Sequence, residues 1–396
     1  MKHASTLAFL WLSACFPTIE ASPTLPASAE TRTVKVFILS GQSNMVGWSH
    51  VRTLPRLGED PRHATLFNKL SGSGARWVVR DDVFIDSNVD DKVRRGMLSV
   101  GYGGGGEAWI GPEFAFGVEM GDLYDEPVLL IKAAWGGKDL YCDFRPPSAG
   151  QPSYRIPPRG DKERDMGVCY RLLVAEVHRA LDDMGKNFPK LKDKEVELAG
   201  LVWFQGWNEM FADKTIQDQV YAEYASNFAH FVKDLREEFD APKLPVVIGE
   251  LGVNGEGANE RTQKLRAAQA GIPKQDSLRG SALFVKTAHL WDQEVDDAFD
   301  HRENVRRDLF RELEPGIAEM MKSELKGEED KKQKTMVRNA TNKALRKRDE
   351  YIAAEKAFER VGSHWECHYH GSAKMYSLIG QALAEGMGKL VADPAQ

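Results

Sequence analysis

The chain has 396 residues, of which 42% are hydrophobic and 28% are charged. This composition supports a large buried core and excludes a collagen-like or intrinsically disordered chain. The formal net charge of -6 lacks the basic excess that binding to nucleic acid or to an anionic membrane usually requires, so neither partner is expected.

Residues 1–29 are expected to form an export signal and a short linker. Lys2 precedes an apolar stretch over residues 7–12, which is too short for a membrane-spanning helix of about 20 residues. Two cleavage patterns compete, a lipoprotein-type site at Cys15 and an ordinary signal-peptidase site over residues 20–22. The protein is therefore expected in the periplasm, at the cell surface or outside the cell, with a lipid on Cys15 as the only membrane attachment.

Three cysteines remain after such a signal is removed: Cys142, Cys169 and Cys367. Disulfides can form in an exported protein, but an odd number of thiols allows at most one bridge within the chain. The sequence leaves the pairing open, and three small buried thiols are the alternative.

Five short apolar runs predict strands in chain order. Each is nearly continuous rather than alternating, which is typical of parallel strands covered on both faces. They are residues 34–39, 127–133, 198–204, 245–248 and 282–285.

Segments with helical spacing separate or follow these runs, at residues 170–181, 221–235 and 373–387. Alternating strands and helices predict a doubly wound, flavodoxin-like α/β fold, with a five-stranded parallel sheet and helices on both faces. In such folds ligands bind outside the carboxyl ends of the strands.

Residues 296–360 interrupt this pattern with a high density of Lys, Arg, Glu and Asp. Good helix formers predict a charged helical insertion, with a turn near residues 327–330, inside one α/β domain made of residues 30–295 and 361–396. It can be a solvated arm or a segment that binds a partner or caps a site. A long insertion costs little closure entropy, about 0.6 kcal/mol per doubling of its length.

The first strand is followed by Ser40-Gly41-Gln42-Ser43-Asn44-Met45. Gly41 lets the backbone turn sharply, and Ser43 then lies at the mouth of the next helix, where backbone N–H groups can support negative charge. This position suits an acyl-transfer nucleophile. The motif is not Gly-x-Ser-x-Gly, because position 45 is Met, and helix capping is the alternative role of the serine.

The next two strands also end in motifs that can donate hydrogen bonds. Gly136 and Gly137 follow the second strand, where a bare backbone N–H can approach a ligand or simply form a turn. Gln205 and Asn208 follow the third strand and carry uncharged amides, which suit a developing oxyanion.

A histidine-rich segment precedes the last helix and contains His364, His368 and His370 beside Cys367. A neutral imidazole, with an ordinary pKa of about 6.5, is the usual base for activating a serine hydroxyl. The spacing matches no zinc signature, so neither a metal nor another cofactor is expected.

Together these motifs resemble the SGNH (GDSL-like) hydrolases, and within them the sialate O-acetylesterase-like proteins and carbohydrate esterase family six. The resemblance spans residues 34–390 outside the charged insertion. It is carried by Gly41-Gln42-Ser43-Asn44-Met45, Gly111-Pro112-Glu113-Phe114, Ala134-Trp135-Gly136-Gly137, Trp203-Phe204-Gln205-Gly206 and His368-Tyr369-His370-Gly371-Ser372-Ala373.

The resemblance implies an exported enzyme that removes acetyl groups from carbohydrate hydroxyls without a metal. It implies Ser43 as the nucleophile and His368 as the general base. The oxyanion hole would combine the Ser43 backbone N–H, a backbone N–H at Gly136 or Gly137, and a side-chain amide. Gln205 is favoured for that amide, and Asn208 is the alternative.

The sequence departs from the superfamily at the acidic residue that usually hydrogen-bonds to the catalytic histidine. The superfamily's histidine usually has an Asp three residues earlier, whereas this chain has Trp365 there. Losing the group that fixes the imidazole tautomer can cost up to about 10⁴ in rate. Glu366, Asp292 or a backbone carbonyl can replace it, and taking His370 as the base instead puts Cys367 in the acid's position.

Aromatic residues adjoin every motif, which favours a carbohydrate substrate because flat rings stack on sugar faces. Gln42 and Gly136 are expected to contact the substrate, as is Asn208. Arg145 can address a sugar carboxylate or sulfate, or brace its own loop. The sequence thus predicts a serine O-acetylesterase for sialate or polysaccharide; the alternatives are a weakly active glycan-binding protein and an esterase for another acyl ester.

Overall fold

The computed structural model describes residues 32–72, 76–158, 160, 162–326 and 328–392. The expected export signal and Cys15 lie outside these residues. Within the described part of the chain, no helix is both long and apolar enough to cross a membrane.

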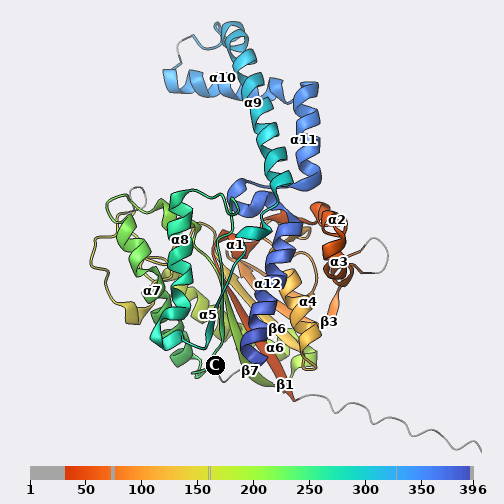
Figure 1. Cartoon of the computed structure of the whole chain (residues 1–396). Coiled ribbons are helices and arrows are strands. Elements are labelled where there is room, and N and C mark those ends of the chain that lie inside the picture. The colour runs from red at the N-terminus through yellow and green to blue at the C-terminus, as the bar shows by residue number, and fades with distance from the viewer. Residues whose placement is uncertain (1–31, 73–75, 159, 161, 327, 393–396) are drawn as a thin grey trace, which may run out of the picture. The chain divides into compact units, whose positions relative to one another are not determined.

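A seven-stranded sheet forms the centre of the α/β domain (Figure 1). The strands run in the order β4-β3-β6-β1-β7-β8-β9, and only β3 and β4 pair antiparallel. A separate two-stranded sheet pairs β2 (Ser49–His50) with β5 (Trp109–Ile110). The main strands are β1 (Thr33–Gly41), β3 (Arg80–Val89), β4 (Lys92–Leu98), β6 (Val128–Ala134), β7 (Glu195–Phe204), β8 (Val246–Gly249) and β9 (Ala282–Val285).

The doubly wound α/β fold is confirmed, and all five predicted strands are present, but the number of strands was wrong. The prediction missed the hairpin of β3 and β4, which adds two strands at one edge of the sheet. Charged residues interrupt both strands, and β4 is mostly exposed, so neither forms a continuous apolar run. Asp90 and Asp91 make the tight turn between them, with φ of 47° and 63°.

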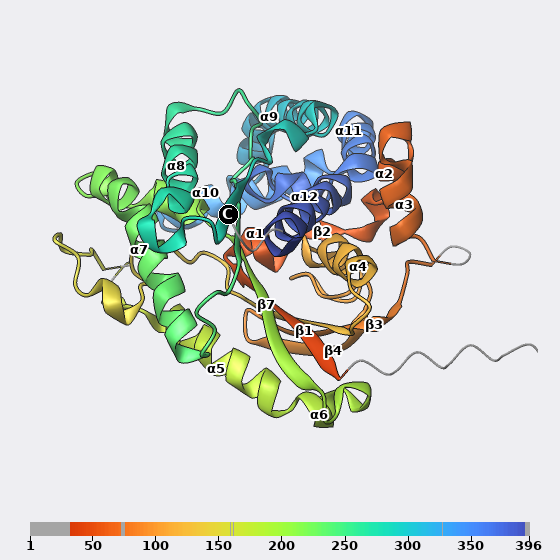
Figure 2. The ribbon, with the colours of Figure 1, turned by 60° about the horizontal axis from the view of Figure 1, so that its bottom comes forward.

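Helices cover both faces of the sheet (Figure 2). On one face Phe116 of α4 (Glu113–Leu123) lies with its ring 5.6 Å from that of Phe37 in β1, and α12 (Ala373–Ala392) packs beside α4. On the other face Trp203 of β7 contacts the rings of α7 (Gln217–Glu238), and α5 (Val168–Asp182) packs beside them. The three predicted helices are therefore confirmed as α5, α7 and α12.

The charged insertion is helical, as predicted, and its described residues form three helices. These are α9 (Gln293–Met320), α10 (Asp330–Leu345) and α11 (Asp349–Val361), and we call them the arm. In Figure 1 the arm rises from the end of the domain at which α1 lies, with α9 and α11 side by side. The remaining helices are α1 (Ser43–Val46), α2 (Pro55–Gly58), α3 (Ala64–Leu70), α6 (Met184–Asn187) and α8 (Glu260–Ala270).

Two arginine side chains fasten the base of the arm to the domain. The Arg56 guanidinium donates two hydrogen bonds of 2.7 Å to the Glu294 carboxylate near the start of α9. Arg52 donates to the backbone carbonyl oxygens of Glu359, at 3.1 Å, and Gly362, at 3.2 Å, where α11 ends. Both ends of the arm are therefore held at the same side of the α/β domain.

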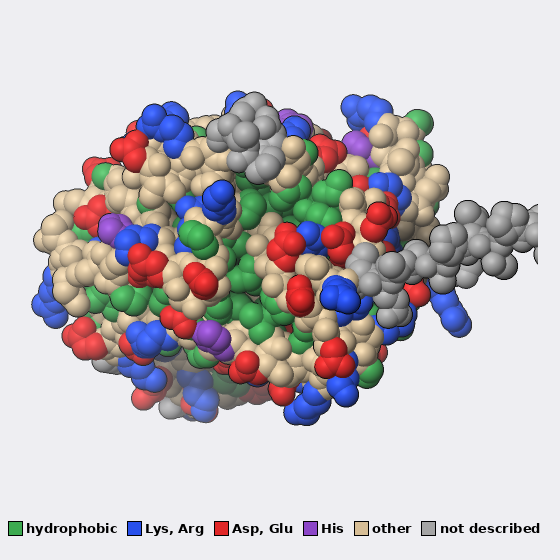
Figure 3. Space-filling view, turned by 90° about the horizontal axis from the view of Figure 1, so that it is seen from below, with side chains coloured by type: hydrophobic (Ala, Val, Ile, Leu, Met, Phe, Trp, Pro, Cys, Tyr) green, Lys and Arg blue, Asp and Glu red, His purple; other side chains and the backbone are tan. Residues whose placement is uncertain are grey.

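The amino ends of the strands lie at the opposite end of the domain, where apolar side chains gather in a groove (Figure 3). The groove has a volume of about 630 Å³, and Leu123, Leu198, Pro245 and Leu390 are among the residues that line it. The serine, glycine and amide motifs follow the carboxyl ends of β1, β6 and β7, so the candidate site lies away from this groove.

Candidate active site

The register of the central strands brings three of the predicted motifs to one edge. Gly41, the last residue of β1, pairs with Ala134 at the end of β6 and with Phe204 at the end of β7. Because the three strands are parallel and end level with one another, the residues that follow them share one edge of the sheet. Ser43, the Gly136-Gly137 pair and Asn208 are those residues.

Ser43 is held by a tight turn. A Cβ atom on Gly41 would lie 2.1 Å from the carbonyl oxygen of Phe204, so the turn requires glycine. Ser43 is 7% exposed and begins α1, and the Gln42 side-chain oxygen accepts a hydrogen bond of 2.5 Å from the Asn44 backbone N–H. The Gln42 side-chain nitrogen and both polar side-chain atoms of Asn44 are buried without a partner among the described residues.

A buried ion pair supports α1 from below, and the sequence analysis missed it. The Lys132 ammonium in β6 donates to the Glu113 carboxylate at 2.7 Å and to the carbonyl oxygens of Val46 and Tyr102, both at 3.0 Å. Both side chains of the pair are fully buried, and burial lowers the pKa of Lys132. The available signal was a single lysine inside an otherwise apolar strand.

The glycine pair after β6 is positioned by the missed hairpin. The Gly136 backbone N–H donates to the Asp90 carboxylate at 2.7 Å, and the Trp135 ring N–H donates to Asp91 at 3.2 Å. The Gly136 amide is thus bonded to a carboxylate of this chain, contrary to its expected role toward the substrate. Gly137, with φ of 72°, is the other glycine predicted to donate a backbone hydrogen bond after this strand.

The side-chain amide of Gln205 is also hydrogen-bonded within the protein, so it is no longer the favoured amide donor to the oxyanion. Its nitrogen donates to the Glu209 carboxylate at 2.7 Å and to the Lys138 carbonyl at 3.1 Å, and its oxygen accepts from the Tyr224 hydroxyl at 2.9 Å. Burial raises the pKa of Glu209 well above its usual range. Asn208 makes no side-chain hydrogen bond to any described residue, and its amide oxygen is buried. The geometry therefore favours Asn208.

His368 and His370 lie on a short helical turn, Glu366–Gly371, which we call the histidine loop, and His364 lies two residues before it. Tyr369 and His370 have φ of 52° and 51°, a left-handed conformation that costs energy in residues other than glycine. The loop is fixed at both sides, because the Gly371 carbonyl accepts a hydrogen bond of 2.9 Å from the Ser49 hydroxyl and the Tyr369 hydroxyl accepts one of 2.8 Å from the Gly252 N–H.

Trp48 connects the segment after Ser43 to the histidine loop. Its ring centroid lies 6.0 Å from that of His368, with an angle of 23° between the planes, and 5.0 Å from that of His364. Trp48 comes two residues after the end of α1, so the nucleophile's helix and the candidate base are linked through one aromatic side chain.

The Nδ1 atom of His368 lies 2.8 Å from the Nδ1 atom of His364, so one imidazole donates to the other. Burial lowers the pKa of both rings, to about 3 for His368 and about 4 for His364. The expected acids bond elsewhere: Glu366 accepts a hydrogen bond of 2.6 Å from Asn254, and Asp292 pairs with Lys374 at 2.8 Å. In this structure a second imidazole occupies the place expected for an acid.

His370 has a carboxylate partner but faces the arm. Its Nε2 atom lies 2.9 Å from the Asp296 carboxylate of α9, and its fully buried ring lies 4.5 Å from that of Phe299. Its Nδ1 atom has no partner among the described residues. The pair therefore ties the arm to the histidine loop, and His368 remains the candidate base.

Arg145 braces its own loop, the second of its two expected roles. Its guanidinium is buried and donates to the carbonyl oxygens of Gly150 at 2.7 Å and Ala149 at 3.3 Å. Among the predicted disulfide candidates, Cys169 and Cys367 carry free thiols, and burial raises the pKa of each.

The sequence of the α/β domain matches a known enzyme family. A family model described as carbohydrate esterase, sialic acid-specific acetylesterase matches residues 33–291, which is more than half of the chain and runs from β1 through β9. The protein is therefore a carboxylic ester hydrolase. It belongs to this family of carbohydrate esterases, and the matched segment ends before α9 and before the histidine loop.

Two solved structures show similarity to this chain. A protein from Arabidopsis thaliana is 18% identical, with a TM-score of 0.39 over 65% of this chain and 86% of its own. A carbohydrate acetylesterase from Xanthomonas citri is 14% identical, with a TM-score of 0.37 over 64% of this chain and 49% of its own. No curated protein matches the chain.

Proposed function

We propose that the protein is a serine O-acetylesterase for carbohydrates, with Ser43 as the nucleophile and His368 as the general base. The shared register of β1, β6 and β7 supports this proposal, because it brings a serine, a glycine turn and an unbonded amide to one edge of the sheet. The link through Trp48 brings the histidine loop to the same segment.

In the first half of the reaction, Nε2 of His368 takes the proton from the Ser43 hydroxyl as the oxygen attacks the acetyl carbonyl carbon. The carbonyl oxygen becomes an oxyanion and accepts hydrogen bonds from the backbone N–H groups of Ser43 and Gly137 and from the Asn208 amide. When the bond to the sugar oxygen breaks, His368 returns its proton to that oxygen and the sugar leaves.

The second half regenerates the enzyme. A water molecule gives a proton to Nε2 of His368 and attacks the acetyl group on Ser43. The tetrahedral intermediate collapses, acetate leaves, and the serine oxygen recovers its proton from His368. Water is the one reactant besides the acetylated sugar, and residues of the chain carry out every proton transfer.

His364 acts as a positioning residue in this mechanism. When Nδ1–H of His368 donates to the bare Nδ1 of His364, Nε2 of His368 carries the lone pair that the reaction requires. The pair at 2.8 Å thus sets the tautomer, which is one of two tasks of the acid in a triad. It does not supply a negative charge to stabilise the imidazolium.

Replacing Ser43 with Ala tests the proposal directly. We expect Ser43→Ala to lower kcat for an aryl acetate by on the order of 10⁴-fold or more, with little change in Tm, because the substitution removes only one hydroxyl group. A serine-directed phosphonate should label Ser43 in the wild type. Ser226→Ala, an exposed serine on α7, is the matched control and should retain full activity.

The absence of a carboxylate bonded to either ring nitrogen of His368 within the described residues favours a second candidate, a glycan-binding protein with weak turnover. The same measurements separate the two. A protein that resists the phosphonate and releases no acetate from acetylated sialic acids or polysaccharides, yet binds them, would be such a binding protein.

A further inference from the structure

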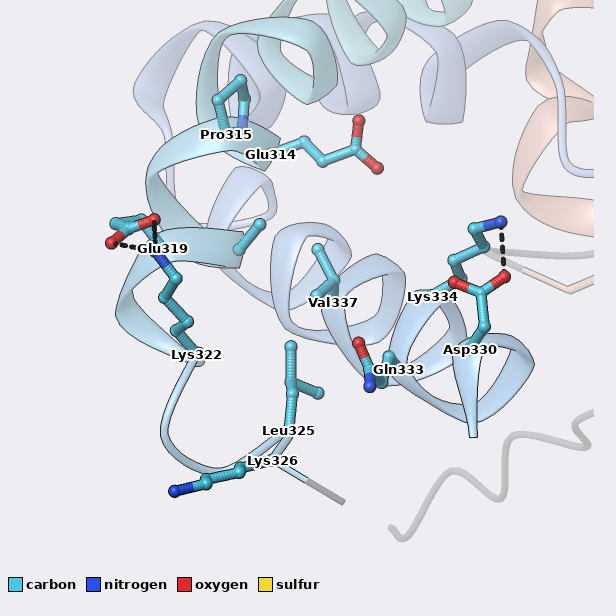
Figure 4. A pocket seen from close by; sticks show the side chains of 11 residues that line it. Glu314, Pro315, Glu319, Lys322, Leu325, Lys326, Asp330, Gln333, Lys334 and Val337 are labelled. Carbon is cyan, nitrogen blue, oxygen red and sulfur yellow. Dashed lines mark hydrogen bonds and ion pairs between the residues drawn. The ribbon is translucent and has the colours of Figure 1, made fainter. Parts of the chain in front are cut away.

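Two pockets of similar size but different charge lie among the described residues of the arm. The outer pocket lies between the end of α9 and α10 and has a volume of about 730 Å³ (Figure 4). Leu325 and Val337 supply apolar side chains there. The dashed lines in Figure 4 show that Lys322 pairs with Glu319, at 3.1 Å, and Lys334 with Asp330, at 2.8 Å. Charges at this pocket are therefore largely neutralised within the arm.

The inner pocket, of about 740 Å³, is lined by all three arm helices and by Trp365 of the segment that leads into the histidine loop. Four exposed cations contribute to its lining and form no ion pair with any described residue: Arg338, Lys343, Arg346 and Lys347. Its volume lies within the usual range for ligand pockets, roughly 300–1,000 Å³.

The carboxylates of the inner pocket do not neutralise these cations. Glu303 bonds to Arg306 at 2.8 Å and to Arg302 at 3.1 Å. Glu355 lies 3.7 Å from Arg302 and accepts a hydrogen bond of 3.0 Å from the Tyr351 hydroxyl. The four remaining cations give the pocket an excess of positive charge, although the chain as a whole carries -6.

Trp365 connects this pocket to the histidine loop. Its side chain is 60% exposed, and its backbone carbonyl accepts a hydrogen bond of 3.0 Å from the N–H of His368. A large exposed aromatic ring beside unpaired cations suits a ligand with both a flat apolar face and negative charge. Sugar rings that carry carboxylate or sulfate groups have both properties.

We propose that the inner pocket of the arm binds an anionic polysaccharide through its carboxylate or sulfate groups and so brings an acetylated sugar of the same chain to Ser43. This proposal rests on the proposed esterase function for the final step only. Guanidinium and ammonium groups bind such anions by charge-assisted hydrogen bonds, and their combined field raises the local concentration of a polyanion. The matched family segment ends at residue 291, so the pocket is a feature of the insertion.

Binding can be measured without turnover. The Ser43→Ala protein is titrated calorimetrically with polygalacturonate, dextran sulfate and neutral dextran, at about 50 mM and about 500 mM NaCl. We expect at least one of the two anionic polymers to bind, more weakly at high salt, and neutral dextran not to bind. The two anionic polymers distinguish carboxylate from sulfate as the recognised group.

A quadruple variant locates the binding site. Replacing Arg338, Lys343, Arg346 and Lys347 with Gln should weaken binding of the polyanion at least about tenfold. The matched control replaces Lys322, Lys326, Lys332 and Lys334 of the outer arm with Gln, which makes the same change in net charge, and it should weaken binding less than about twofold. An equal loss in both variants, or no binding of either anionic polymer, would overturn the proposal.

Kinetics on acetylated polymers completes the test. In the inner quadruple variant, KM for acetylated polygalacturonate should rise about tenfold more than KM for acetylated xylan, a neutral polymer. Equal effects on the two polymers would exclude selective anion recognition. If the protein binds the polyanion but releases no acetate, the esterase proposal fails and the proposed binding site stands. If it releases acetate but does not bind the polyanion, only the proposal of a binding site in the arm fails.

Discussion

The α/β domain and the arm place their charged side chains in opposite environments. In the domain, Lys132 and Glu113 pair at full burial beneath α1, and the candidate base His368 is kept neutral by burial. In the arm, Arg338 and Arg346 are exposed and form no ion pair with a described residue. Buried polar groups fix geometry, whereas exposed charges act at a distance and weaken with salt. Substitutions in the domain should therefore affect hydrolysis and stability, whereas substitutions in the arm should affect binding of polyanions.

The largest expected effect concerns the candidate base in the domain. We expect His368→Ala to lower kcat/KM for an aryl acetate by on the order of 10⁴-fold, and to leave calorimetric binding of a polyanion to the arm within about twofold. A variant that keeps more than a tenth of the activity would exclude His368 as the base.

Replacing its partner His364 should change the pH dependence. Because the pKa of His368 is lowered to about 3, its base form persists as the pH falls, and kcat/KM should hold down to about pH 4 instead of declining near 6.5. His364→Asp places a carboxylate at Nδ1 of His368 and stabilises its imidazolium form. The fall of kcat/KM at low pH, which we call the acid limb of the profile, should therefore move to higher pH. His364→Asn keeps a neutral acceptor and should leave that limb low. An acid limb near 6.5 in the wild type would contradict this account.

Breaking the buried ion pair should affect stability. Lys132→Met leaves the Glu113 carboxylate buried without its charge partner, which typically costs about 3–5 kcal/mol of unfolding free energy. Urea unfolding measures the loss. Adding Glu113→Gln to the same protein removes the unpaired charge and should recover part of the loss; no recovery would show that the carboxylate is not the cause.

The smallest expected effect on aryl acetate hydrolysis is that of removing most of the arm. The guanidinium carbon of Arg302 lies 4.1 Å from the centroid of the Phe358 ring, so the two ends of the deleted segment lie close together. A short linker can therefore replace residues 302–357 at little cost in loop-closure entropy. The shortened protein should remain soluble and hydrolyse an aryl acetate within about threefold of the wild type, while losing affinity for polyanions. Insoluble protein would show that the arm is needed for folding.

The sequence was sufficient to place the central strands because β1, β6, β7, β8 and β9 are continuous apolar runs. The β3–β4 hairpin was missed because charged residues alternate along an edge strand, although its turn residue Asp90 positions Gly136. Motifs identified candidate residues but not their partners. Gln205 was favoured over Asn208 because nothing in the chain order shows that Glu209 and Lys138 occupy its amide.

The acid partner of His368 was not predictable for a related reason. Local register offered Glu366, and the position after the fifth strand offered Asp292, but both bond to residues far away in sequence. The observed partner, His364, lies four residues earlier on the same segment, and only the left-handed backbone at Tyr369 and His370 shows how tightly that segment is folded.

The Asp296–His370 contact joins the arm to the segment that carries the proposed base. Asp296 lies in the first turn of α9, and His370 is two residues from the proposed base, in a loop whose strained backbone has little freedom to absorb a displacement. The hydrogen bond between Asp296 and His370, together with the contact between the rings of Phe299 and His370, therefore anchors the first turns of α9 to the loop that carries the proposed base.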